Sequence, residues 1–215
     1  MFDLHTHTTM TDGDLLPTEL VRRAAVRGYD TLAITDHADA SNIESLIKAV
    51  NSIKKSAALF GVNLYSGVEL THVPPEEIDE LSKYARKCGA EIVIVHGETV
   101  VEPVAPGTNL AACTSDYVDI LAHPGLISGE AALEAKRHNI ALEITSRGGH
   151  NRTNGHVFKA AMKSGCRVVI NSDTHGPSDL LTENARKLVA MGAGMTSDEA
   201  DSILSDKTLK EILDL

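Results

Sequence analysis

The sequence is poor in aromatic and basic residues, the two kinds that nucleic-acid-binding proteins use most. It has no Trp, three Phe and four Tyr, so few rings are available to stack on bases or sugars. Its 20 Lys and Arg are outnumbered by 30 Asp and Glu, which gives a formal net charge of −10. Nonspecific binding of nucleic acid needs clustered basic residues that neutralise phosphates. We therefore expect polar, ionic recognition of a small partner and no nucleic acid.

Cysteine and long apolar runs are also scarce. Cys88, Cys113 and Cys166 are odd in number and form no CxxC pair, so we expect small buried side chains rather than disulfides or a cysteine zinc site. No apolar run approaches the roughly 18 residues of a membrane helix. The chain enters "MFDLHTHT" without the basic and apolar leader of a secreted protein. We predict a cytoplasmic protein that makes no use of a membrane.

What is present is a repeated pattern of short apolar runs and longer segments with helical periodicity, read as one domain over residues 1–215. Seven predicted strands are Phe2–Leu4, Thr31–Thr35, Leu64–Val68, Ile92–Val95, Ile120–Ala122, Ala141–Ile144 and Val168–Asn171. Predicted helices are Pro17–Arg27, Ile43–Phe60, Glu76–Lys87, Glu130–His138, His156–Ser164 and Asp179–Met191, then one through Leu204 capped by Ser197 and Asp198, and Thr208–Leu213. Only residues 97–119 lack a clear pattern. Seven strands that each return through a helix favour a closed or nearly closed parallel barrel over an open sheet.

Residue types that bind metals follow every predicted strand, at the end where a βα barrel collects its active site. In chain order they are His5 and His7, Asp36 and His37, Glu69, His96, His123, Glu143, and Asp173 and His175. A single histidine after a strand is usually a core or loop residue, but six of them in one ring indicate metal binding. Residues two apart in an extended segment project to the same side, so each His-x-His or Asp-x-His pair can address one ion or two neighbouring ions.

The ligand chemistry indicates several ions and a hydrolytic reaction. Imidazole and carboxylate together suit zinc, manganese and iron, and six histidines with at least three carboxylates exceed the needs of one ion. A carboxylate such as Glu69 can bridge two ions. Clustered divalent ions lower the pKa of bound water towards about 7 and neutralise phosphoryl oxygens. The sequence has no nucleophile elbow and no Walker loop, so phosphate ester hydrolysis by water is the expected reaction.

The ordered motifs resemble one known family, the polymerase and histidinol phosphatase (PHP) family. They are "DLHTHT" with "TDG", then "ITDH", "SGVE", "VHGE", "AHPG", "LEI" and "NSDTH". The resemblance covers nearly the whole chain and implies a distorted (β/α)7 TIM-like barrel with metal ions at the carboxyl ends of its strands. It further implies one ion at His5, His7, Glu69 and Asp173, a second at Glu69, His96 and His123, and a third at Asp12, His37 and His175. In that scheme Glu69, Asp173 and His175 are the candidate catalytic residues. "TDG" also reads as a simple turn.

Other polar residues have two readings. Asp36 and Glu143 either accept a hydrogen bond from a ligand imidazole, which we favour, or close the barrel end. Arg147, His150 and Arg152 follow the sixth strand in "TSRGGHNRT", where a guanidinium can pair two phosphate oxygens, although they can equally be loop residues in solvent. His72, His138 and His156 fall outside the family's ligand pattern.

The resemblance leaves three classes of function open. The first is a phosphatase of small phosphate monoesters, with a histidinol phosphate-like compound as one candidate. The second is a nuclease or nucleotide phosphoesterase, which the acidic and aromatic-poor composition disfavours. The third is a noncatalytic RNA-associated barrel subunit, which would need neither nine ligands nor an acidic surface. We expect two to three divalent ions and a small phosphorylated substrate.

Overall fold

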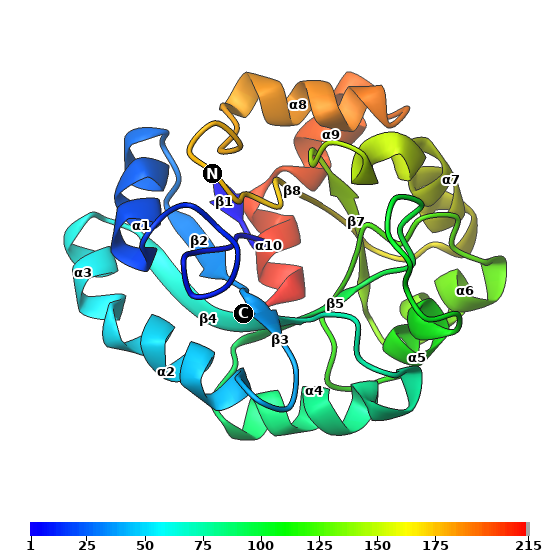
Figure 1. Cartoon of the computed structure of the whole chain (residues 1–215). Helices are drawn as coiled ribbons and strands as arrows, with labels where there is room; N and C mark the ends of the chain where they lie inside the picture. The colour runs from blue at the N-terminus through cyan, green and yellow to red at the C-terminus, as the bar shows by residue number, and fades with distance from the viewer. Residues whose placement is uncertain (214–215) are drawn as a thin grey trace.

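A parallel sheet curls into a nearly closed barrel with helices around it (Figure 1), in a computed structural model that describes residues 1–213. The strands on its main path are β1 (Phe2–Asp3), β2 (Thr31–Ile34), β4 (Asn63–Leu70), β5 (Ile92–His96), β6 (Ile120–Ala122), β7 (Ala141–Thr145) and β8 (Val168–Asn171). Each neighbouring pair is parallel. The seven predicted strands and the barrel are therefore confirmed. A two-residue strand that was not predicted, β3 (His37–Ala38), pairs with the outer half of β4.

Side chains close the seam between β1 and β8, where backbone pairing is reduced to one bridge between Thr6 and Thr174. The Leu4 amide donates to the side-chain oxygen of Asn171 at 3.0 Å. The Ser172 amide donates to both oxygens of Asp3 at 3.3 and 3.1 Å. Buried amides need such partners, so these side chains join the first and last ligand-bearing segments.

The helices largely follow the predicted periodicity. They are α1 (Pro17–Val26), α2 (Ile43–Ser52), α3 (Lys54–Leu59), α4 (Ile78–Lys87) after the 3₁₀ turn Pro75–Glu77, α5 (Thr108–Cys113), α6 (Gly129–Arg137), α7 (Asn154–Ser164) after the 3₁₀ turn His150–Thr153, α8 (Glu183–Gly192), α9 (Ser197–Ile203) and α10 (Asp206–Ile212). Helix α1 begins with Pro17 at its first turn, where a missing amide costs nothing. The unpatterned segment 97–119 contains one short helix, α5.

Several helix boundaries differ from the prediction by a residue or two, and three further differences have a clear physical reason. The predicted helix Ile43–Phe60 is two helices. At Ile53 the backbone amide donates to the Val50 carbonyl, three residues earlier, which ends α2. Helix α3 then packs in a different core cluster from most of α2. The predicted start at Asp179 is wrong because that carboxylate accepts the amides of His175 and Gly176. Thr182 caps α8 instead. Thr196, not Ser197 or Asp198, caps α9 through a capping box with Glu199.

The core has an outer layer between strands and helices and an inner layer within the barrel. The inner cluster includes Phe2, Leu4 and Ile94, and Leu209 and Ile212 of α10 pack against it. In the view of Figure 1, α10 overlaps the middle of the ring of helices. Its Asp206, Lys207, Lys210 and Glu211 are exposed, and Glu211 contacts Arg167 just before β8. The last helix therefore covers the amino end of the barrel and leaves the carboxyl ends of the strands to polar side chains. Cys113 and Cys166 are buried and Cys88 half-buried, all as free thiols. Across residues 1–213, every helix is too short or too polar to cross a membrane; the cytoplasmic location stays a prediction.

Candidate metal centre

The strand ends bring the predicted ligands together around one cavity of about 430 Å³. His5, His7 and His123 follow strands, while Glu69 and His96 lie in β4 and β5. Asp173 and His175 come after β8, and Asp12 comes from the loop between β1 and α1. The cavity wall includes Asp12, His37, His96, His123, Asp173 and His175. The ring inferred from sequence order is thus a spatial ring.

Glu69 and Asp173 form the centre of a buried group of imidazoles. Glu69 Oε1 lies 3.4 Å from His5 Nε2 and 3.5 Å from His123 Nε2. Asp173 Oδ1 lies 3.2 Å from His7 Nε2 and 3.7 Å from His5 Nε2. Several of these atoms are buried and have no hydrogen-bond partner among the described residues, namely His5 Nε2, both nitrogens of His7, Glu69 Oε1, Asp173 Oδ1 and Nδ1 of His96 and His123. Buried polar atoms rarely stay unpaired, so the group is built for a further partner.

The spacing of these atoms fits divalent metal ions. Two ligands that each bind zinc at about 2.0–2.1 Å in a tetrahedron lie roughly 3.3–3.4 Å apart. The N···O distances of 3.2 to 3.7 Å from His5, His7 and His123 to Glu69 and Asp173 straddle that value and exceed most N–H···O hydrogen bonds. The contact of His37 Nδ1 with Glu69 Oε2 is shorter, at 2.8 Å. Neutral imidazole and carboxylate are also the donors that zinc, manganese and iron accept. The residues present therefore fit such ions.

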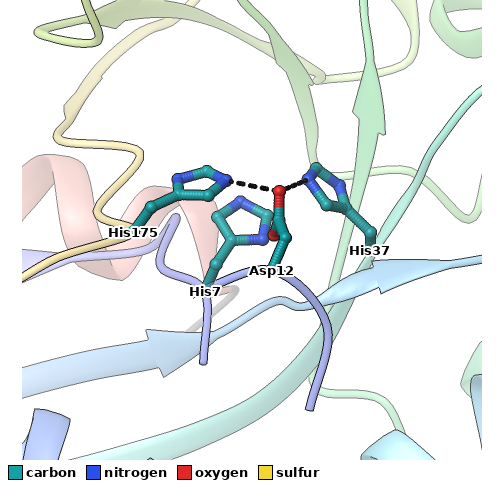
Figure 2. A group of neighbouring side chains, drawn as sticks. All are labelled: His7, Asp12, His37 and His175. Atoms are coloured by element: carbon teal, nitrogen blue, oxygen red, sulfur yellow. Dashed lines mark ion pairs between the residues drawn. The ribbon is translucent and has the colours of Figure 1, made fainter. Parts of the chain in front are cut away.

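A second group lies nearer to solvent, on the side of the cavity shown in Figure 2. One oxygen of Asp12 lies between His37 Nε2 at 3.4 Å and His175 Nε2 at 3.3 Å. The His7 ring stacks on the His175 ring with centroids 4.2 Å apart. The ligand atoms of Asp12, His7, His37 and His175 all lie within 4.8 Å of one another. The turn "TDG" therefore delivers a carboxylate to the cavity.

Charge explains how these groups coexist without metal. Burial lowers the pKa of the His37 imidazole, but the carboxylates of Glu69 and Asp12 outweigh it and raise that pKa to about 10. Burial raises the pKa of Asp173, but the positive charges of His5, His7 and His123 hold it well below its usual range. Burial lowers the pKa of His96 to about 4. Burial and opposite charges therefore act against each other throughout this group.

Unusual backbone supports the ring. His123 has φ of 28° and Asp173 has φ of 54°, a region that non-glycine residues rarely adopt and that often marks functional sites. The glycines of "AHPG" and "TDG" permit close approach: a Cβ on Gly125 would lie 1.9 Å from the Glu98 oxygen, and one on Gly13 would lie 2.6 Å from the His7 backbone. Each motif glycine thus lets a neighbouring loop pack directly onto a ligand-bearing segment.

Glu143 and Asp36 hold the ring in different ways. Glu143 Oε1 lies 2.8 Å from His5 Nδ1, and its other oxygen accepts the His123 amide at 3.1 Å, so Glu143 orients a candidate ligand ring as predicted. Asp36 accepts the amide and hydroxyl of Thr8 at 2.7 Å and the hydroxyl of Thr11 at 2.8 Å. The prediction that Asp36 orients an imidazole is wrong. Asp36 lies next to residues 8–11 and holds the turn that carries Asp12.

Of the three residues predicted to bind substrate, two line the cavity and one does not. Arg147 and His150 line the cavity. Arg147 also meets Asp179 at 3.4 Å, and His150 Nδ1 lies 2.8 Å from the Thr99 hydroxyl. Arg152 is exposed and is not among the residues that line this cavity within the described chain.

Two cavity residues escaped the sequence reasoning. His72 and Glu102 both line the cavity, and their ligand atoms lie within 4.8 Å of each other and of His96. Glu102 gave no signal because it lies in segment 97–119, which has no periodicity. His72 was set aside because it falls outside the ligand pattern of the family. Its φ of 55° is visible only in the structure.

Comparison with known proteins places the chain among related sequences. A protein of Methanocaldococcus jannaschii described as uncharacterized is 50% identical over 205 residues, 94% of each chain. A Bacillus subtilis protein named DNA polymerase/3'-5' exonuclease PolX is 25% identical over 229 residues, which is 98% of this chain but 40% of that one. A probable phosphatase of Shewanella pealeana is 29% identical over 194 residues, 81% of this chain and 77% of that one.

The fold and the family are shared more widely. A two-domain Bacteroides vulgatus protein described as containing a predicted PHP-like metal-dependent phosphoesterase superposes with a TM-score of 0.54 at 17% identity, over 82% of this chain and 52% of that one. At that identity the likeness shows the fold alone. The family model of the PHP domain matches residues 3–204, which is nearly the whole chain. The chain therefore belongs to the PHP domain family.

Proposed function

We propose that this chain is a metal-dependent phosphoesterase that hydrolyses small phosphate monoesters. The observation that carries the proposal is a set of buried imidazole and carboxylate atoms, spaced 3.2 to 3.7 Å apart at the carboxyl ends of the strands, that have no hydrogen-bond partner among residues 1–213. The name of the Shewanella pealeana relative, a probable phosphatase, supports the same reaction class. Two to three ions of zinc, manganese or iron fit the number of donors.

The proposed division of ligands follows the groups in space. One ion would be held by His5, His7, Glu69 and Asp173, a second by Glu69, His96 and His123, and a third by Asp12, His37 and His175. When bound, such ions supply an activated water and neutralise the phosphoryl charge. Glu69 and Asp173 would hold the ions in register, because each faces imidazoles from several strands.

The chain's own groups would bind and orient the ester. His175 stands at the cavity wall with Nδ1 3.0 Å from the Asp173 carbonyl oxygen, which leaves Nε2 directed at the Asp12 side of the cavity. Arg147, across the cavity wall, can pair two phosphate oxygens. His150, fixed by Thr99, can donate or accept one further hydrogen bond. Buried Asp173 and Glu69 keep bulk water from the base of the site.

Cavity size and charge support a small monoester over a polynucleotide. A space of about 430 Å³ suits a metabolite, and its wall contains Asp12, Asp39 and Glu102 but no aromatic ring other than histidine. A nuclease is the second candidate because the match to PolX spans 98% of this chain. A noncatalytic RNA-associated role is the weakest candidate, since it would not need a complete set of donors.

The deciding experiment loads the purified chain with manganese, zinc or iron and compares p-nitrophenyl phosphate with bis(p-nitrophenyl) phosphate. A panel of phosphorylated metabolites, histidinol phosphate among them, and short oligonucleotides follows. We expect turnover of monoesters and little turnover of diesters. Preference for the diester and the oligonucleotides would favour the nuclease. Less than one equivalent of bound metal with no activity on any substrate would contradict both.

The variant His123→Ala tests the assignment of the metal ligands. Because His123 contacts both Glu69 and Asp173, its removal should lower metal content and turnover together while circular dichroism shows an intact barrel. Full activity in this variant would contradict the proposal that these residues hold the catalytic metal ions.

A further inference from the structure

At the mouth of the cavity, one carboxylate outside the nine proposed ligands is surrounded by imidazoles. Glu102 Oε2 lies 3.1 Å from His96 Nε2 and 3.4 Å from His72 Nε2. Its Oε1 lies 3.4 Å from His150 Nε2. These histidines come from three different segments, after β4, at the end of β5 and after β7. The tertiary structure, and not closeness in sequence, therefore brings these side chains together.

The loop that carries Glu102 is held firmly at both ends. Glu98 Oε1 accepts the amides of Gly107 and Asn109 at 3.1 and 2.9 Å. Asn109 Oδ1 accepts the Glu98 amide at 2.9 Å, and its amide nitrogen donates to the Pro124 carbonyl at 2.8 Å. These hydrogen bonds join residues 98 and 109, so the segment between them forms a loop whose two ends are held together. Glu102 is therefore presented to the cavity by a braced loop.

The contacts around Glu102 are spaced like ligands of a metal ion. They measure 3.1 to 3.4 Å, whereas the edge of a zinc tetrahedron with bonds of about 2.0–2.1 Å is roughly 3.3–3.4 Å. All three are ion-pair contacts between an imidazole nitrogen and a carboxylate oxygen. His72 also adopts a φ of 55°, a backbone cost that persists only where the surroundings enforce it.

We infer that His72, His96 and Glu102 form a further site for a divalent transition-metal ion at the mouth of the cavity, with His150 facing the second oxygen of Glu102. Imidazole and carboxylate donors suit zinc, cobalt and manganese. The side chains of His72 and Glu102 are 46% and 38% exposed, so this ion is open to water and is held more weakly than ions around buried Glu69.

His96 links the mouth site to the inner centre. It belongs to the group with Glu69 and His123 and also to the group with His72 and Glu102. Its Nε2 faces Glu102, while its Nδ1 is buried without a hydrogen-bond partner. His72 and Glu102 belong to the mouth alone. Variants of these two residues therefore test the mouth without removing any of the nine proposed ligands.

The test is a titration of the metal-free full chain with Co²⁺, followed by visible absorption and elemental analysis, without substrate. In the wild type we expect tight binding classes for ions at the buried inner group, a weaker class for the ion near Asp12 and, last, a weaker class for the ion at the mouth. His72→Ala and Glu102→Gln should each weaken binding in that last class alone. We expect affinity to fall by at least about 10- to 100-fold, because loss of a residue that only supports a ligand already costs that much. His138→Ala is the matched control, because His138 pairs with Asp116 and does not line the cavity.

Two results would overturn the inference. The first is an identical set of binding classes in the wild type and in both variants. The second is loss of a tightly bound ion in Glu102→Gln, which would place Glu102 inside the main centre. Neither depends on phosphoesterase activity, so the mouth site and the proposed function stand or fall separately.

Discussion

The candidate metal ligands form two groups, an inner half and an outer half, that differ in burial and in the elements that build them. In the inner half, the side chains of His5, Glu69 and Asp173 are 0%, 0% and 4% exposed. In the outer half, Asp12 is 54% exposed and His37 is 26% exposed. The inner donors stand in or directly after strands, whereas Asp12 belongs to a turn. The molecule thus combines a buried inner group with a more exposed outer group.

This difference should set the order of metal affinity. Buried charges without partners are costly, so the inner group gains most from an ion and should release it last. The outer donors Asp12, His37 and His175 are partly exposed, so an ion there relieves less unpaired buried charge. We therefore expect stepwise removal by a chelator, outer ion first, and the four variants below test that order from the largest effect to the smallest.

Glu69→Gln should have the largest effect because Glu69 serves both halves. Its Oε1 faces His5 and His123 in the inner half, and its Oε2 lies 2.8 Å from His37 Nδ1 in the outer half. We expect loss of more than one ion and a fall in activity well beyond the about 10- to 100-fold typical of supporting residues. Elemental analysis and turnover of p-nitrophenyl phosphate measure both. Retention of all ions would show that Glu69 does not join the halves.

Glu143→Gln should weaken the inner half only. The carboxylate is fully buried and fixes the His5 ring through Nδ1, and a neutral amide makes a weaker partner for a ring that binds a cation through its other nitrogen. We expect inner metal affinity to fall by about 10- to 100-fold, measured by competition with a chelator, while the outer ion is unchanged. An equal loss in both halves would mean that Glu143 acts through general stability of the barrel.

The inner half was more predictable from sequence than the outer half or the mouth. Apolar runs end in His5-x-His7 and Asp173-x-His175, and strand periodicity alone puts such pairs on one side. The ring follows because parallel strands in a barrel end at the same face. Asp12 needed the resemblance to a family, because "TDG" by itself predicts only a turn.

What could not be predicted depends on side-chain contacts between distant loops. Glu102 reaches the cavity because Glu98 and Asn109 brace its loop, a pairing that leaves no periodic trace. Asp179 resembled a helix start but accepts two loop amides instead. Likewise, Asp36 follows a strand as a ligand would, yet it holds Thr8 and Thr11. Strand-end position predicts that a residue is near the site but not what it contacts.

Asp12→Asn should affect the outer half alone. The hydrogen bond from His37, and the nearby charges of His37 and His175, hold the pKa of Asp12 well below its usual range, so the aspartate is ionised and supplies a negative charge that asparagine lacks. We expect one weakly held ion to be lost in isothermal titration and the inner ions to stay bound. Activity should fall less than in Glu69→Gln. Loss of an inner ion as well would show that the two halves are not independent.

Arg147→Ala should give the smallest effect, because Arg147 lies on the cavity wall and holds no ion. A hydrogen bond to a charged group is worth about 1.5–3 kcal/mol, so loss of a phosphate contact should raise KM by roughly 10-fold or more with kcat and metal content little changed. Arg152→Ala is the matched control, since Arg152 is exposed and outside the lining of the cavity. If the two variants have the same KM as the wild type, the phosphate is held by the metal-binding halves alone, and Arg147 serves only its ion pair with Asp179.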